Sequence, residues 1–270
     1  MDKQIESGDT QNATSEAQSA IAAVLPAANS LAPSEVMDTF PLPIRTLVDE
    51  SHELAARIGA FYQADPNSGR PGFESVAFRV PADTPQRMTN LVTAAREMVL
   101  ICILGNATTQ RGLRAEFEQA EKTLRTIKRT LAFYYDDGIT TQEDEQLEAL
   151  ASEHVDETSS LANLSAALYD YGRMAQRDNE ALAIIETWDK QLPELALQLS
   201  ATLAGPAPEV DKKDIDLRNR ILTLLSRESR KIRRAAEFLY ADNFNDLYRR
   251  YFTSSYARNR RLERMRRAAQ

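Results

Sequence analysis

Residues 113–134 read LRAEFEQAEKTLRTIKRTLAFY, and this stretch decides the fold class. Its apolar residues follow one another at intervals of 4, 3, 4, 3, 4 and 3, namely Leu113, Phe117, Ala120, Leu124, Ile127, Leu131 and Tyr134. Because an α-helix has about 3.6 residues per turn, this spacing places them in one seam along a helix. Such a seam packs against a nearly parallel or antiparallel neighbouring helix.

The chain repeats this pattern after a polar turn at Asp136-Asp137-Gly138. The second seam holds Leu147, Leu150, His154, Leu161, Leu164, Leu168 and Tyr171. Thr140 and Glu143 have the spacing of a capping box that would start this second helix. Two long seamed helices joined by a short turn predict an antiparallel hairpin over residues 108–176.

The other periodic stretches are also helical. Helical faces recur in residues 44–61 and 181–203, and Thr84-Pro85 and Gly105 have the chemistry of a helix start and end. Val76, Phe78 and Val80 alternate instead, which predicts a short edge strand or an extended loop. We therefore predict an all-α protein, an elongated, coiled-coil-like helical bundle with a long antiparallel hairpin and a basic helical C-terminal module.

Composition divides the chain into four parts. Residues 1–35 are rich in Ala, Ser, Gln, Asn and Thr, which predicts a flexible arm or an arm that orders against a partner. Residues 36–204 carry the helical bundle. Gly205-Pro206-Ala207-Pro208 marks a linker over residues 205–211, and residues 212–270 form the basic C-terminal module.

Charge is distributed unevenly between these parts. Residues 212–270 carry 17 Lys and Arg against 7 Asp and Glu, a net charge of +10. The remaining residues carry 33 acids and 16 bases, a net charge of −17, so the total of −7 conceals a basic C-terminal region. Such a region can hold a polyanion, an acidic partner or the acidic remainder of the same chain.

The arginines of this region concentrate in residues 249–267, where the only acid is Glu263. Arginine binds phosphate and carboxylate groups with two parallel hydrogen bonds, and tyrosine rings can stack on bases. The candidate residues for binding a polyanion or a partner are Arg249, Arg250, Arg258, Arg260, Arg261, Arg264, Arg266, Arg267, Tyr251 and Tyr256. Aromatic residues at helical spacing also suit a core, and a solvated tail remains the third interpretation.

No catalytic motif, metal site or cofactor-binding motif stands out, so we assign no catalytic residue, metal ligand or cofactor. His52 and His154 are the only histidines, and neither fits the Glu-x-x-His pairs of a di-metal bundle. The single cysteine, Cys102, excludes an internal disulfide. We expect no transmembrane segment and no secretion signal, and hence a cytoplasmic location.

These patterns favour a non-catalytic structural or adaptor subunit of a larger assembly, in contact with protein subunits or with further copies of itself. Its Arg-rich C-terminal segment would contact an acidic protein surface or nucleic acid. A nucleic-acid-binding protein that acts through the basic C-terminal helices is the alternative. A helical-bundle enzyme with a carboxylate/His metal site is a weaker one.

Overall fold

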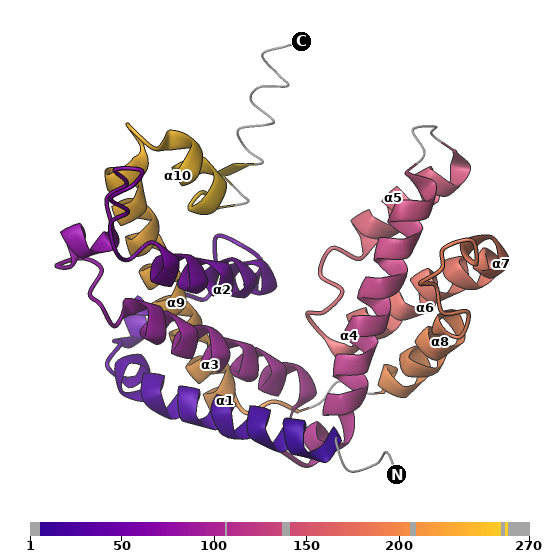
Figure 1. Ribbon diagram of the computed structural model, residues 1–270. Coiled ribbons are helices and arrows are strands. Elements are labelled where there is room, and N and C mark those ends of the chain that lie inside the picture. Colours follow the sequence, from indigo (N-terminus) through magenta and orange to yellow (C-terminus); the bar gives the residue numbers. More distant parts are fainter. Residues whose placement is uncertain (1–5, 106, 137–140, 206–208, 255–256, 259–270) are drawn as a thin grey trace. The chain divides into compact units, whose positions relative to one another are not determined.

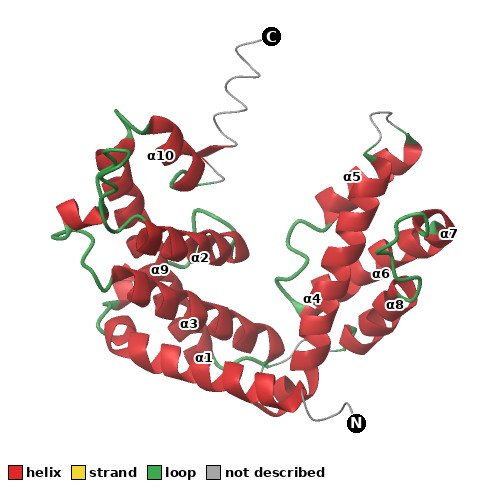
Figure 2. Ribbon diagram, in the orientation of Figure 1, coloured by secondary structure: helices red, strands yellow, loops and turns green. Residues whose placement is uncertain are grey.

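The computed structural model describes residues 6–105, 107–136, 141–205, 209–254 and 257–258. All regular structure in these ranges is helical, with ten α-helices, two short 3-10 helices and no strand (Figure 2). The predicted all-α class is therefore confirmed for the described part of the chain. None of the helices in these ranges is long and apolar enough to cross a membrane.

The chain divides into two compact units. We call Leu100–Asp211 the middle unit, and Met1–Val99 together with Lys212–Gln270 the terminal unit. The middle unit contains the end of α3 (Thr84–Leu104), α4 (Ala107–Tyr135), α5 (Gln142–Glu153), α6 (Leu161–Arg177), α7 (Asn179–Leu182) and α8 (Leu192–Leu203). The terminal unit contains most of α3, α1 (Glu6–Asn29), η1 (Pro33–Glu35), α2 (Ile44–Ala60), η2 (Phe73–Val76), α9 (Lys212–Tyr240) and α10 (Asn245–Tyr251).

The middle unit is built on α4, α6 and α8, which pack side by side (Figure 1). The predicted seam of α4 is buried at Phe117, Ala120, Leu124, Ile127 and Leu131. These side chains belong to one core with Leu164 and Leu168 of α6 and Leu199 of α8. The 3.5-residue spacing in the sequence thus identifies the buried side of α4 correctly.

The second helix of the expected hairpin is interrupted in the structure. α5 ends at Glu153 and α6 begins only at Leu161. Between them the Ser159 hydroxyl donates to the Asp156 carbonyl at 2.7 Å, and Ser160 caps α6 by accepting from the Asn163 N–H at 3.1 Å. Side-chain hydrogen bonds to the backbone compete with a continuing helix, and they explain the break.

The terminal unit is arranged around α9, which packs against α1, α2, η2 and α10. An aromatic cluster fixes the short helix α10 beside the end of α9. The ring of Phe252, just after α10, stacks on Tyr240 of α9 at 5.6 Å and meets Phe73 edge-on at 5.7 Å. The Tyr240 hydroxyl donates to the Pro71 carbonyl at 3.0 Å. Gly72 follows Pro71, and a Cβ there would lie 2.4 Å from the Tyr62 carbonyl oxygen, so only glycine fits.

The structure adds detail to two expectations for the N-terminal half. Within the predicted arm of residues 1–35, which stays a prediction, residues 6–29 form α1, and its small buried residues Ala17, Ala20 and Ala28 allow close packing on α9. The alternation of Val76, Phe78 and Val80 does not form a strand. Val76 ends η2, and Val76 and Val80 are buried while Phe78 is 80% exposed, which is helical rather than strand spacing.

The predicted boundaries at residues 35, 204 and 211 stay predictions. The predicted linker follows α8, and its residues 206–208 lie outside the described part of the chain. The structure adds that the helices on its C-terminal side pack with those of the first 99 residues.

Candidate anion-binding site

Helix α9 carries most of the described basic residues of the C-terminal region. Its apolar residues point into the terminal unit and are buried at Ile221, Leu222, Leu225, Ile232 and Ala236. Because these positions recur at helical spacing, the arginines between them fall on the sides of the helix that face neighbouring elements or solvent.

Three arginines of α9 are bound within the terminal unit. Arg220 donates from Nη1 to the Leu31 carbonyl at 2.7 Å, and Arg227 Nη1 lies 3.1 Å from Glu35 Oε1. Arg233 Nη2 lies 2.5 Å from Glu50 Oε2 on α2. The side chains of Arg233 and Glu50 are only 22% and 14% exposed, so this pair is well shielded from solvent. Three of the arginines of α9 are therefore already paired with carbonyl or carboxylate oxygens of residues 31–50.

Two further arginines of α9 are exposed and available. Arg230 and Arg234 make no ion pair or side-chain hydrogen bond with any residue that the structure describes. They are four residues apart, so they lie one turn apart along α9. Their guanidinium groups are free to bind an external anion.

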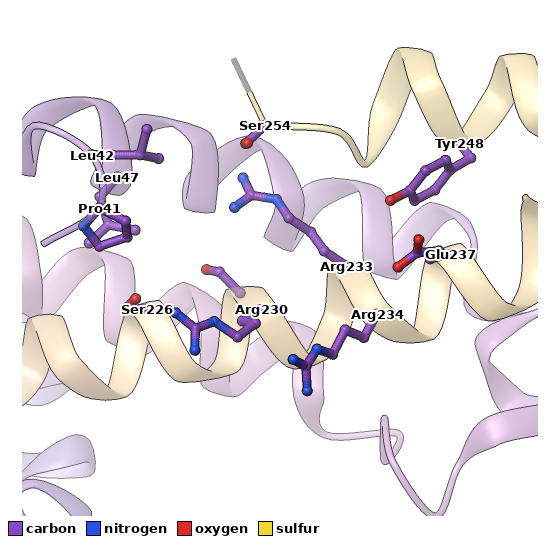
Figure 3. A pocket seen from close by; sticks show the side chains of 11 residues that line it. Pro41, Leu42, Leu47, Ser226, Arg230, Arg233, Arg234, Glu237, Tyr248 and Ser254 are labelled. Atoms are coloured by element: carbon purple, nitrogen blue, oxygen red, sulfur yellow. The ribbon is translucent and has the colours of Figure 1, made fainter. Parts of the chain in front are cut away.

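A cavity of about 260 Å³ opens beside these arginines (Figure 3). Its walls come from the loop before α2, from α2, α9 and α10, and from Ser254 after α10. It is lined by Pro41, Leu42, Leu47, Ser226, Ser229, Arg230, Arg233, Arg234, Glu237, Tyr248 and Ser254. One wall is apolar and the other is mainly cationic, so the cavity suits a group that combines a negative charge with apolar surface.

Some hydrogen-bond donors that line this cavity have no acceptor among the described residues. Figure 3 shows the Arg233 side chain extending from α9 toward Ser254, with the Tyr248 ring directed into the same space from α10. The Nε of Arg233 is buried and donates to no acceptor in the described ranges. A buried donor of a charged group left unpaired costs about 1–3 kcal/mol, which an anionic ligand would recover.

Tyr248 and Ser254 add neutral donors. Burial raises the pKa of the Tyr248 hydroxyl, and the nearby Glu237 raises it further while Arg233 lowers it. The hydroxyl therefore stays protonated and can donate. Ser254 Oγ accepts from the Ala257 N–H at 3.3 Å, which leaves its own O–H to donate to a ligand.

None of the residues that we predicted from the sequence lines this cavity: four lie on α10 or after it, and six lie outside the described ranges. Arg249 and Arg250 are exposed on α10, and Arg258 is exposed beyond it. Tyr251 is half-buried, with its ring 5.7 Å from Phe61 and the Arg250 guanidinium 5.3 Å from its centre. The remaining predicted residues lie outside the described residues, namely Tyr256, Arg260, Arg261, Arg264, Arg266 and Arg267.

The cavity itself was not predicted from the sequence. The run Arg230-Lys231-Ile232-Arg233-Arg234 was visible as a basic cluster, but the higher arginine density of residues 249–267 drew the assignment there. Pro41 and Leu42 complete the cavity from about 190 residues away in the chain. No local pattern signals such a pairing.

The two histidines do not share a site. His52 is exposed on α2. His154 is buried in the middle unit, where its Nε2 lies 2.8 Å from Asp170 Oδ2. Within the described ranges, no three His, Cys, Asp or Glu side chains lie close enough together to hold a metal ion.

Comparison with protein families, with characterised protein sequences and with solved structures finds no match for this chain.

Proposed function

We propose that this chain is a non-catalytic adaptor or structural subunit that binds an acidic segment of a partner protein through the basic side of α9 and α10. The elongated bundle, its long hairpin and the basic C-terminal module belong to this proposal, as do a cytoplasmic location and assembly with other subunits. The binding surface consists of Arg230, Arg234 and Arg249 together with the cavity around Arg233.

One observation carries the proposal: Arg230 and Arg234 are exposed and unpaired within the described residues, while their neighbours on α9 bind carboxylates. Arg227 and Arg233 pair with Glu35 and Glu50 of the same unit. Arginines of α9 therefore already bind carboxylate groups within the unit. The unpaired Arg230 and Arg234 lie on the same helix, exposed to solvent, and offer the same chemistry to a carboxylate of a partner.

Nucleic-acid binding through the same helices is the second candidate, favoured by the eight arginines of residues 249–267. The cavity fits it less well, because the apolar wall at Pro41 and Leu42 has no use beside a sugar-phosphate backbone. A metal enzyme built on His52 or His154 is a weaker alternative that no arrangement in the described residues favours.

The experiment measures binding of fluorescein-labelled poly-L-glutamate by anisotropy, for the wild type and for Arg230→Gln/Arg234→Gln. We expect affinity to fall about tenfold in the double variant, because two charge-assisted contacts are lost. The matched control is Arg125→Gln/Arg129→Gln, which removes two exposed arginines with the same spacing from α4. Equal affinity in both double variants would refute the proposed surface.

A further inference from the structure

We infer that the cavity around Arg233 binds one carboxylate of the partner, a Glu or Asp side chain flanked by an apolar residue. This inference rests on the proposed function and specifies the group that the basic surface recognises. The carboxylate accepts from Arg233, with Tyr248 and Ser254 as neutral donors, and the apolar neighbour packs on Pro41 and Leu42.

Two donors of the cavity have no acceptor among the described residues. Glu50 binds Nη2 of Arg233 from the α2 side at 2.5 Å, and Nε of the same guanidinium is buried without an acceptor in the described ranges. The Tyr248 hydroxyl likewise has no hydrogen-bond partner among the described residues, and Figure 3 shows it directed into the cavity. A carboxylate has two oxygens and about four lone-pair directions, so one carboxylate can accept from both groups.

The charge of the site matches a monoanion. Arg230, Arg233 and Arg234 line the cavity together with Glu237, and Glu50 neutralises Arg233 from behind. These five groups leave one uncompensated positive charge. A carboxylate brings one negative charge and neutralises it. A phosphoryl group brings nearly two at pH 7 and would place excess negative charge beside Glu237.

The size of the site matches a side chain rather than a larger ligand. Its volume of about 260 Å³ lies below the roughly 300–1,000 Å³ of pockets for drug-sized molecules. Pro41, Leu42 and Leu47 form an apolar wall beside the donors. An acidic side chain next to Leu or Ile would occupy both parts, whereas a run of acids alone would leave the apolar wall uncovered.

The test uses the full chain and three fluorescein-labelled peptides, GSGLELGSG, GSGLQLGSG and the same peptide with phosphoserine at the central position. We expect the Glu peptide to bind at least tenfold more tightly than the Gln peptide and more tightly than the phosphoserine peptide. Equal binding of the Glu and Gln peptides, or tighter binding of the phosphoserine peptide, would overturn the assignment of a carboxylate.

Tyr248→Phe and Ser254→Ala locate the binding in the cavity. Each removes one hydroxyl and keeps the packing, so we expect fivefold weaker binding of the Glu peptide by each variant. Tyr62→Phe is the control, since Tyr62 is a partly exposed residue of the same unit that does not line the cavity. Binding by both cavity variants within twofold of the control would refute the inference.

Two further measurements separate this inference from the proposed function and guard against unfolded variants. The Arg233 Nε–H resonance, assigned with Arg233→Lys, should shift on addition of the Glu peptide and not of the Gln peptide; an unchanged resonance counts against the site. If Arg230→Gln/Arg234→Gln weakens poly-L-glutamate binding while the cavity variants bind the Glu peptide normally, only the carboxylate cavity fails. If poly-L-glutamate does not bind at all, the proposed function fails.

Discussion

The pair between Glu50 and Arg233 should stabilise the terminal unit far more than its exposed counterpart on the same helix. Two unit charges about 4 Å apart attract by about 4 kcal/mol at the effective dielectric constant of about 20 near a protein surface. Desolvation and side-chain ordering offset part of this attraction, and removal of one partner from a fully buried pair costs about 3–5 kcal/mol. Because Arg233 is 22% exposed and Gln keeps one acceptor oxygen, we expect Glu50→Gln to cost about 2 kcal/mol.

Glu53→Gln provides the matched control. Glu53 also lies on α2 and pairs with Arg57 at 2.6 Å, but its side chain is 61% exposed against 14% for Glu50. Exposed pairs contribute about 0.2–1 kcal/mol, so this variant should cost less than about 0.5 kcal/mol.

Hydrogen exchange measured by mass spectrometry on peptides from α2 and α9 reads the stability of the terminal unit directly. A loss of 2 kcal/mol speeds exchange of the protected amides about 30-fold. If both variants exchange within twofold of the wild type, shielding from solvent does not strengthen the Arg233 pair, and the electrostatic reasoning for the cavity is refuted.

Three predictions concern the middle unit, whose stability is reported by fluorescence of Trp188, the only tryptophan, during urea unfolding. Leu124→Ala should lower the free energy of unfolding by about 2–5 kcal/mol, because Leu124 is 2% exposed in the α4 seam. The control Arg125→Ala should lower it by less than about 0.5 kcal/mol, because Arg125 is exposed on the same helix. Similar losses in both variants would contradict the burial of the seam. Tyr171→Phe should stabilise the unit by about 1 kcal/mol, since the buried Tyr171 hydroxyl has no partner among the described residues, and a loss of stability would show that it does have one. Burial and the nearby Glu157 raise the pKa of Tyr171 from 10.0 to about 12, so the folded state keeps its proton as the unfolded state loses it, and stability should fall between pH 10 and 12. Tyr171→Phe should make this loss of stability with pH shallower. The remaining loss comes from Tyr135, because burial and a hydrogen bond to Asp178 raise the pKa of Tyr135 to about 12. An equally steep loss of stability in Tyr171→Phe would refute the assignment to Tyr171.

The features that the sequence predicted are those fixed by local spacing. Leu124 and Ile127 are buried as the seam requires, and α3 runs from Thr84 to Leu104 with Gly105 after it at a φ of 78°. The cap of α5 was predicted one residue too early, because Thr141 and Asp144 form the capping box. Thr140 lies outside the described residues.

The features that the sequence did not predict depend on contacts between distant segments. α1 has few large apolar side chains, and its alanines are buried only because α1 packs closely on α9. The cavity forms only when the loop at Pro41 meets α9 and α10. Nothing in the sequence near Arg233 indicates that its Nε would be buried without an acceptor.

The central claim is that the basic side of α9 and α10 binds acidic protein segments rather than nucleic acid. The most direct test is the ratio of two dissociation constants for the wild-type chain at 0.15 M salt. One is measured with poly-L-glutamate and the other with a single-stranded oligonucleotide of equal charge. Our account predicts tighter binding of poly-L-glutamate by at least tenfold, because a single Glu side chain fits the cavity of about 260 Å³ and a sugar-phosphate backbone does not. Tighter binding of the oligonucleotide, with a steep loss of affinity as salt rises, would contradict it.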